Sequence, residues 1–309
     1  MNPDQIIKNI EKIMIGKQEV VILLTTALLA EGHVLLEDVP GVGKTTLARS
    51  LARTIDCGFT RIQFTPDTLP SDITGLSVYN MKKSEFEFVK GAVMNHIILA
   101  DEINRTAPKT QASLLEAMEE RQVTVDRVTY PLPAPFMIIA TQNPVDSLGT
   151  YQLPEAQLDR FMMKLTIGYP DSGHEKIMMK QKLSGDIEKT LEAVVSKDEL
   201  ITMQNEVKQV FVHDDLLEYV IEIMNKTRKS LRLSLGASPR ATIMLIYAAQ
   251  AYAYLKGRDF VIPEDIIYLS HHVIPHRFLL SQEGRINKIT TSGILSDILK
   301  ETRVPVVAK

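Results

Sequence analysis

The sequence predicts an α/β fold with a five-stranded parallel sheet, followed by an all-helical second domain. In the first half of the chain, short and almost continuously apolar runs alternate with helical patterns, as they do in sheets covered on both faces. Beyond residue 170 nearly every segment has the apolar spacing of a helix. A length of 309 residues is sufficient for two domains.

Five segments have the length and apolar character of buried strands: residues 33–37, 60–64, 97–101, 136–141 and 163–167. A glycine-rich turn and a helix over residues 44–54 follow the first of them. The longest apolar run, residues 20–30, is about half the length of a membrane-spanning helix, so we expect a buried helix there and no membrane span.

Two insertions interrupt the alternation of strands and helices. Residues 66–95 contain strand-like pieces at 77–79 and 86–89. Residues 122–131 alternate with period two around Asp126 and Arg127, which predicts a hairpin. Insertions of this length are usually functional, although a decorated surface is the alternative.

The second half of the chain begins where the composition shifts, near Tyr169. We therefore expect one domain over residues 1–170 and another over residues 171–309. The strongest helix signal starts at Ser238, which suits an N-cap, with Pro239 at the first helical position and Gly257 after the end.

Composition excludes several classes of protein. The net charge of −3 argues against a nucleic-acid coat or a polybasic membrane-surface protein. Tryptophan is absent and aromatic residues make up 6% of the chain, so a stacking platform for single strands is not expected. The single cysteine, Cys57, excludes an intramolecular disulfide framework and fits a reducing, cytoplasmic compartment. The first ten residues lack the apolar region of a signal peptide.

A glycine-rich segment lies between the first predicted strand and the helix that follows it, which is the context of a phosphate-binding P-loop. Its candidate nucleotide contacts are Pro40, Gly41, Val42, Gly43, Lys44, Thr45 and Thr46. The glycines let backbone N–H groups surround phosphates, and the helix N-terminus adds a positive field. Lys44 is expected to reach the β- and γ-phosphates of ATP, and the Thr45 hydroxyl to bind Mg²⁺.

Asp38 departs from this motif, because it stands where the first glycine is usual. Aspartate is among the few residues that tolerate a left-handed backbone. Its carboxylate would repel phosphates, so we expect that carboxylate to point away from them.

The third predicted strand ends in two carboxylates. Asp101 is expected to hold the Mg²⁺ shell, and Glu102 to orient and deprotonate the attacking water. Adjacent side chains on a strand face opposite ways, so both can serve one site only if the strand ends there. Asn143 follows the fourth predicted strand and could hydrogen-bond the water or the γ-phosphate; Gln142 is the alternative.

Taken in this order, the motifs resemble the MoxR family of AAA+ ATPases. The segments that carry the resemblance are residues 35–45, 101–106, 114–118, 140–144, 153–161, 238–240 and 276–277. The strings DEINR at 101–105 and LPEAQLDRF at 153–161 are the most specific of them.

The resemblance implies a P-loop AAA+ core with a helical lid, and Mg²⁺-dependent ATP hydrolysis at the subunit interfaces of a ring, usually a hexamer. It implies that Arg160 is an arginine finger for the neighbouring subunit and that Arg240 is the lid sensor of the γ-phosphate. Gly16 would lie beside adenine, and Arg105 has no assigned role. Family members act as chaperone-like maturation factors for protein complexes, often with a partner that contains a von Willebrand factor A-type domain.

Two other functions remain open for the same set of motifs. One is a magnesium chelatase-type ATPase subunit, which shares the mechanism. The other is a nucleic-acid motor with a similar hairpin, but the charges of Asp126 and Arg127 cancel at the hairpin tip and the chain is acidic. Nucleic acid is therefore not the expected partner. A metal site at His272 and His276 is not expected either, because Pro275 interrupts the helix between them.

Overall fold

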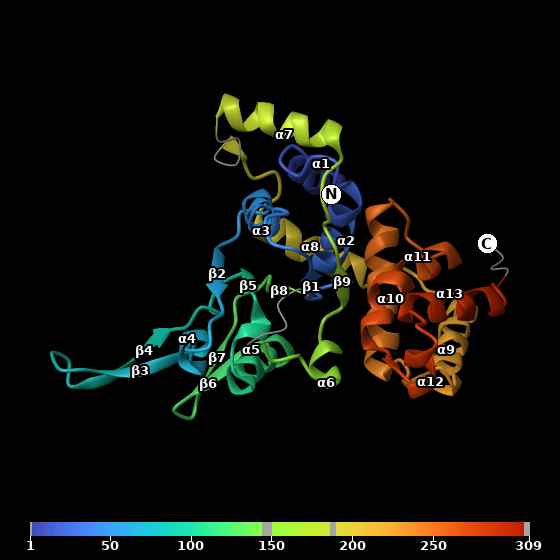
Figure 1. The fold of residues 1–309 in the computed structure, drawn as a ribbon. Coiled ribbons are helices and arrows are strands. Elements are labelled where there is room, and N and C mark those ends of the chain that lie inside the picture. The colour runs from blue at the N-terminus through green and yellow to red at the C-terminus, as the bar shows by residue number, and fades with distance from the viewer. Residues whose placement is uncertain (1, 144–149, 186–189, 306–309) are drawn as a thin grey trace. The chain divides into compact units, whose positions relative to one another are not determined.

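The computed structural model describes residues 2–143, 150–185 and 190–305 (Figure 1). Contacts divide the chain into two compact units, each made of several segments. The first unit comprises Met1–Thr25, His33–Leu153 and Leu165–Ile201. The second unit comprises Thr26–Gly32, Pro154–Lys164 and Thr202–Lys309.

The central sheet has five strands in the order β2-β5-β8-β1-β9. Their bounds are β1 Val34–Glu37, β2 Phe59–Gln63, β5 Ile97–Asp101, β8 Met137–Gln142 and β9 Met163–Leu165. Neighbouring strands β2, β5, β8 and β1 pair in parallel. The predicted α/β class with a five-stranded parallel sheet is confirmed, and each strand lies within two residues of its predicted bounds.

Strands β1, β5 and β8 are buried almost throughout, so the centre of the sheet needs cover on both faces. The longer helices before residue 210 are α1 Asp4–Glu11, α2 Gln18–Leu29, α3 Lys44–Thr54, α5 Pro108–Glu120, α7 Ser172–Ser184 and α8 Lys197–Val207, and α3 contacts both β2 and β5. Helix α3 has the predicted bounds, and α2 is the buried helix expected from the longest apolar run. Among the residues described, no helix combines the length and the apolarity that a membrane crossing requires.

Both insertions of the first unit contain an antiparallel hairpin: the hairpin predicted over residues 122–131 is confirmed, and the two strand-like pieces predicted within residues 66–95 pair with each other. The first contains α4 Pro70–Thr74, β3 Gly75–Asn80 and β4 Glu85–Lys90, and the second contains β6 Gln122–Val125 and β7 Val128–Pro131. Figure 1 shows the β3–β4 hairpin as a long ribbon that extends from the sheet. Phe88 and Tyr130 stack with their ring centroids 4.0 Å apart, so the two hairpins contact each other.

The second unit is predominantly helical. Its elements are α6 Glu155–Leu158, α9 Asp214–Lys229, α10 Pro239–Leu255, α11 Pro263–Val273, the 3₁₀ helix η3 Pro275–Arg277, α12 Gln282–Ile286 and α13 Thr291–Glu301. Ser238 caps α10 by accepting a hydrogen bond from the Ala241 backbone N–H, as the sequence predicted. A short antiparallel pair, β10 Leu233–Leu235 and β11 Leu279–Leu280, accompanies the helices and had no signal in the sequence.

The contact-based units differ from the single boundary expected near residue 170. Residues 171–201 belong to the first unit because α7 packs there: Gln181 donates to the Lys12 carbonyl, and the His174 ring lies against Gly16. Residues 154–164 belong to the second unit instead. The composition shift near residue 170 marks the change from alternating strands and helices to helices alone. The two units are instead defined by contacts between segments that are distant in the sequence. The division into residues 1–170 and 171–309 therefore stays a prediction.

A buried histidine of the first unit, His33, makes contacts that suit its neutral form. The Nδ1 atom of His33 accepts from the Ile138 backbone N–H, so a neutral ring is required, and Nε2 lies 3.2 Å from the Met118 carbonyl oxygen. Burial, with the charge of Arg121 adding to it, lowers the pKa of His33 to about 4.

We predict that the free energy of unfolding falls as the pH drops from about 6.5 towards 4, because the unfolded chain then binds a proton that the folded chain does not. The full effect of His33 is on the order of 3 kcal/mol. Urea unfolding at several pH values would measure it. His33→Gln, which cannot titrate, should show a smaller loss; the same slope in both proteins would contradict this assignment.

Candidate active site

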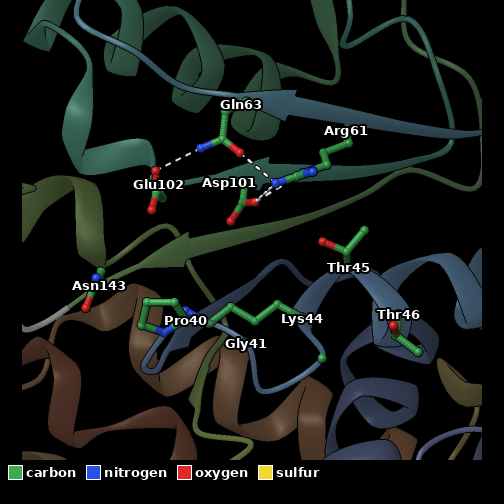
Figure 2. Close-up of a pocket in the computed structure, with 11 residues that line it drawn as sticks. Pro40, Gly41, Lys44, Thr45, Thr46, Arg61, Gln63, Asp101, Glu102 and Asn143 are labelled. Carbon is green, nitrogen blue, oxygen red and sulfur yellow. Dashed lines mark hydrogen bonds and ion pairs between the residues drawn. The ribbon is translucent and has the colours of Figure 1, made fainter.

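A pocket of the first unit lies where the sheet strands end and α3 begins (Figure 2). Its lining residues come from the loop after β1, the start of α3, alternate positions of β2, and the ends of β5 and β8. They are Pro40, Gly41, Gly43, Lys44, Thr45, Thr46, Arg61, Gln63, Asp101, Glu102 and Asn143. The structure therefore brings the predicted phosphate loop, acidic pair and sensor amide together in one site.

The loop after β1 takes a shape that requires glycine at two positions. Gly41 has φ +85° and Gly43 has φ +96°, both in the left-handed region. A Cβ atom at Gly41 would meet nothing within 4 Å, so the backbone angle, not space, is the constraint there. Gly43 is the N-cap of α3 and supplies no side-chain acceptor to the first turn. The backbone N–H groups of that turn can therefore donate to a phosphate.

Lys44 extends from the first turn of α3 into the pocket. Its Nζ donates to the Asp38 carbonyl oxygen at 2.5 Å. Burial lowers the pKa of Lys44, and the carboxylates of Asp38, Asp101 and Glu102 oppose that shift. Phosphate oxygens would add negative charge to the same surroundings and favour the charged amine further.

The carboxylate of Asp38 is turned away from the pocket, as expected. Oδ2 accepts from the backbone N–H groups of Ile167 at 2.6 Å and Gly168 at 2.7 Å, and Oδ1 accepts from that of Val39. The reason expected for tolerating aspartate here was wrong, because Asp38 is not among the residues with positive φ. Asp38 instead joins the P-loop to the chain after β9, a contact that glycine could not make.

Strand β5 ends at Asp101, and the next residue takes an unusual backbone conformation. Glu102 has φ 57° and ψ 48°, a left-handed conformation that costs a non-glycine residue on the order of 1 kcal/mol. This turn breaks the alternation of the strand, so Asp101 and Glu102 both line the pocket. The requirement that the strand end at this point is met.

Polar side chains hold both carboxylates, as Figure 2 shows for those from β2. Arg61 donates to Asp101 Oδ2 through Nη2 at 2.6 Å and Nε at 3.1 Å. Gln63 donates to Glu102 Oε2 at 2.8 Å and accepts from Arg61 Nη2 at 2.7 Å. Arg105, which had no assigned role, forms an ion pair with Glu102 at 3.3 Å.

A buried hydroxyl on β8 joins the two acidic residues directly. Thr141 Oγ1 donates to Asp101 Oδ1 at 2.7 Å and accepts from the Glu102 backbone N–H at 2.9 Å. Thr141 is fully buried, so this hydroxyl has no competing water. It fixes one oxygen of Asp101 and the backbone of the left-handed residue at once.

These residues fit a nucleotide with a bound divalent cation. The loop offers backbone N–H groups and one amine to phosphates, while Thr45 and Asp101 offer oxygen ligands of the type that Mg²⁺ prefers. Mg²⁺ in nucleotide sites takes one or two protein ligands and completes its shell with phosphate and water. The donor set is therefore adequate, and Arg61 competes with a cation for Asp101.

Some predicted site residues lie elsewhere in the structure. Val42 and Gly16 are not among the lining residues of the pocket; a Cβ at Gly16 would lie 2.5 Å from the His174 ring. Of the two amide candidates, Asn143 lines the pocket and Gln142 does not. Arg160 follows α6 and Arg240 is the second residue of α10, both in the second unit.

Sequence reasoning missed Arg61, Gln63 and Thr141. Arg61 and Gln63 are two apart on β2, so they share one face of that strand, and this was the only signal available. In the sequence, Thr141 is one residue of an apolar strand, and nothing near it indicates a role in the site. Its role depends on the parallel register between β5 and β8, which no local pattern specifies.

Comparison with known proteins agrees with this geometry. Residues 33–163 match the family "ATPase family associated with various cellular activities (AAA)", and residues 225–298 match the AAA lid domain. The chain is 53% identical to the uncharacterised protein YeaC of Bacillus subtilis, covering 97% of this chain and 94% of that one. It is 38% identical to the chaperone MoxR1 of Mycobacterium tuberculosis, covering 98% and 82% respectively. The crystal structure of an ATPase candidate from Cytophaga hutchinsonii superposes with a TM-score of 0.92 at 40% identity, covering 98% and 94%.

We predict that Asp38→Asn lowers the free energy of unfolding by about 2 kcal/mol, because a neutral amide offers one acceptor oxygen to three backbone N–H groups that are buried or partly buried. Asp171→Asn is the matched control, since Asp171 also accepts a backbone N–H, from His174, but is exposed. That change should cost little, because asparagine caps helices as well as aspartate. Urea unfolding of both variants tests the prediction, and equal losses would contradict it.

Proposed function

Since the chain belongs to the MoxR family of AAA ATPases, we propose that it hydrolyses ATP with Mg²⁺ and uses the hydrolysis to remodel or mature protein complexes. The observation that carries the proposal is the pocket that unites the P-loop with Asp101, Glu102 and Asn143. The chaperone name of the Mycobacterium tuberculosis relative supports the protein-directed part.

In this proposal five of the lining residues act directly on the nucleotide, its metal ion or the attacking water. Lys44 and the N–H groups of the first turn of α3 bind the phosphates. Thr45 and Asp101 hold Mg²⁺, which when bound supplies positive charge to the transferring phosphoryl group. Glu102 orients the attacking water and accepts its proton, and Asn143 hydrogen-bonds the water or the γ-phosphate. The remaining P-loop candidates and the adenine contact stay as predictions from the sequence; they are Pro40, Gly41, Val42, Gly43, Thr46 and Gly16.

The proposed active form is a ring of copies of this chain, with six as the expected number. Arg160 would complete the neighbour's site, as arginine fingers worth about 10³–10⁵ in turnover do in other phosphoryl-transfer enzymes. Arg240 would reach the γ-phosphate from the lid of the same subunit. We place this ring in the cytoplasm, with a partner that contains a von Willebrand factor A-type domain.

Contacts within the first unit support a route from the pocket to the hairpins. Helix α5 follows Arg105, and its Gln111 donates to the Ile103 carbonyl at 3.1 Å. From the same helix, Thr110 donates to the carbonyl of Thr68, in the first insertion, at 2.9 Å. A displacement at Glu102 can therefore reach α4 and the β3–β4 hairpin through hydrogen-bonded neighbours.

The end of the β3–β4 hairpin is suited to a protein client. Met81 is 86% exposed and Phe86 is 73% exposed, so large apolar surface is available far along the ribbon. Two lysines, Lys82 and Lys83, are followed closely by two glutamates, Glu85 and Glu87, and Lys83 pairs with Glu87 at 2.5 Å. A phosphate backbone would find no uninterrupted positive surface there, which favours a protein client over the nucleic-acid motor. A magnesium chelatase-type ATPase subunit, which would share the mechanism, remains the second candidate.

Substitutions in the pocket test the ATPase chemistry. Lys44→Ala should abolish nucleotide binding, because the amine and its charge are lost. Glu102→Gln should bind ATP normally and hydrolyse it at least about 100-fold more slowly, since an amide cannot accept the proton. Equilibrium binding of a fluorescent ATP analogue and phosphate release measure the two quantities. Wild-type turnover in Glu102→Gln would contradict the assignment of the base.

A second experiment tests the client surface. Proteins that copurify with Glu102→Gln in the presence of ATP should be lost when Met81→Ser and Phe86→Ser are added. The same two substitutions in the otherwise wild-type chain should leave ATP hydrolysis within about twofold, because both side chains are exposed surface positions. Leu231→Ser, at an 87% exposed leucine of the second unit, is the control and should retain the captured proteins. Equal capture by the hairpin variant and the control would remove the hairpin from client binding.

A further inference from the structure

The second unit contains a buried arginine that the proposed chemistry does not use. Arg277, in η3, is 3% exposed. Its Nε donates to Asp159 Oδ1 at 2.8 Å, and its Nη2 donates to the carbonyl oxygens of Asp159 at 3.1 Å and Phe161 at 2.7 Å. Those two carbonyls flank Arg160, so one guanidinium holds the backbone on both sides of the proposed finger.

The Asp159 carboxylate extends these contacts to α10. Ser238 Oγ donates to Asp159, at 2.8 Å from Oδ1 and 2.9 Å from Oδ2. The same Oγ accepts from the Ala241 backbone N–H at 3.1 Å and so caps α10. Arg240 lies in that capped first turn. Asp159 is thus hydrogen-bonded to Arg277 on one side and to the start of the Arg240 helix on the other.

Charge and geometry both favour a stiff connection. Burial lowers the pKa of Arg277 to about 10, the Asp159 carboxylate opposes that shift, and the charge of Arg240 adds to it. The guanidinium is planar and presents its donors in fixed directions, so it can serve two carbonyls and a carboxylate together. A buried charge that lost one of these partners would be left uncompensated, which disfavours any arrangement that separates them.

We infer that Asp159 and Arg277 are positioning residues that make the Arg160 segment and the first turn of α10 move as one body. The functional consequence of this inference rests on the proposed roles of Arg160 and Arg240. The contact of Arg240 with a subunit's own nucleotide is then coupled to the presentation of Arg160 to the neighbouring subunit. Nucleotide binding in one subunit would thereby change the rate of ATP hydrolysis in the neighbouring subunit.

Mixtures of variants test this coupling through activity. The reference is a mixture of Arg160→Ala and Glu102→Gln subunits. Where the two meet, the intact Glu102 of the first subunit can receive the intact Arg160 of the second, so activity should be restored. Arg277→Lys keeps the positive charge but loses the planar set of guanidinium donors. In a subunit with this substitution, we expect both Arg240 and Arg160 to be misplaced. Mixed with either Arg160→Ala or Glu102→Gln, Arg277→Lys should stay below about a tenth of the reference activity. Full rescue in either mixture would mean that only one arginine depends on Arg277, and would overturn the inference.

Hydrogen exchange tests the coupling without using activity. On adding ATP, the peptides covering residues 155–162 and 239–246 should change protection together in the wild type and separately in Arg277→Lys. Joint change in that variant, or no joint change in the wild type, would overturn the inference. A reference mixture without rescue would count against the trans finger alone, and the exchange result would still decide the coupling.

A second variant guards against simple misfolding of Arg277→Lys. Ser238→Ala removes the bond from α10 to Asp159 together with the helix cap. Ser281→Ala is the control, because it removes an equivalent cap: Ser281 Oγ accepts from the Gly284 backbone N–H at the start of α12. Separate exchange of the two peptides in Ser238→Ala, with joint exchange in Ser281→Ala, is the expected result. Joint exchange in both would overturn the inference.

Discussion

The hydroxyl of Thr141 is the contact on which the pocket depends. It is buried between β5 and β1 in the sheet, and it links one oxygen of Asp101 to the backbone N–H of Glu102. Without it, the left-handed Glu102 would lose this hydrogen bond to its N–H, and Asp101 would keep its contacts to Arg61 through Oδ2. The parallel sheet matters for function because its register delivers this hydroxyl to the end of β5.

Around this contact, three cations from different elements face the two carboxylates. Arg61 holds Asp101, Arg105 holds Glu102, and Lys44 approaches from the opposite side of the pocket. A nucleotide with Mg²⁺ changes the partners of these groups, because phosphates attract Lys44 and Mg²⁺ competes for Asp101. The second unit contains a comparable arrangement at Arg277. Its buried guanidinium donates both to the Asp159 carboxylate and to the backbone carbonyls of Asp159 and Phe161.

The sequence predicted the parts of the site that have a local signature. The bounds of α3, the end of β5 at Asp101 and the cap at Ser238 follow from composition and spacing over a few residues, and the structure has all three. The reason for Asp38, the contacts of Arg61 and the bridging role of Thr141 depend on neighbours about 40 to 130 positions away. Such pairings are set by strand order and register, which a single sequence does not encode in any short segment.

The most direct test of the account is the pair Thr141→Val and Thr141→Ser. Valine keeps the β-branched shape and removes the hydroxyl, whereas serine keeps the hydroxyl. The account predicts that Thr141→Val lowers the turnover number for ATP at least about tenfold, since a hydrogen bond to a charged group is worth about 1.5–3 kcal/mol, while nucleotide affinity changes little. Thr141→Ser should stay within about threefold of the wild type. Wild-type turnover in Thr141→Val would contradict the claim that this hydroxyl organises the acidic pair.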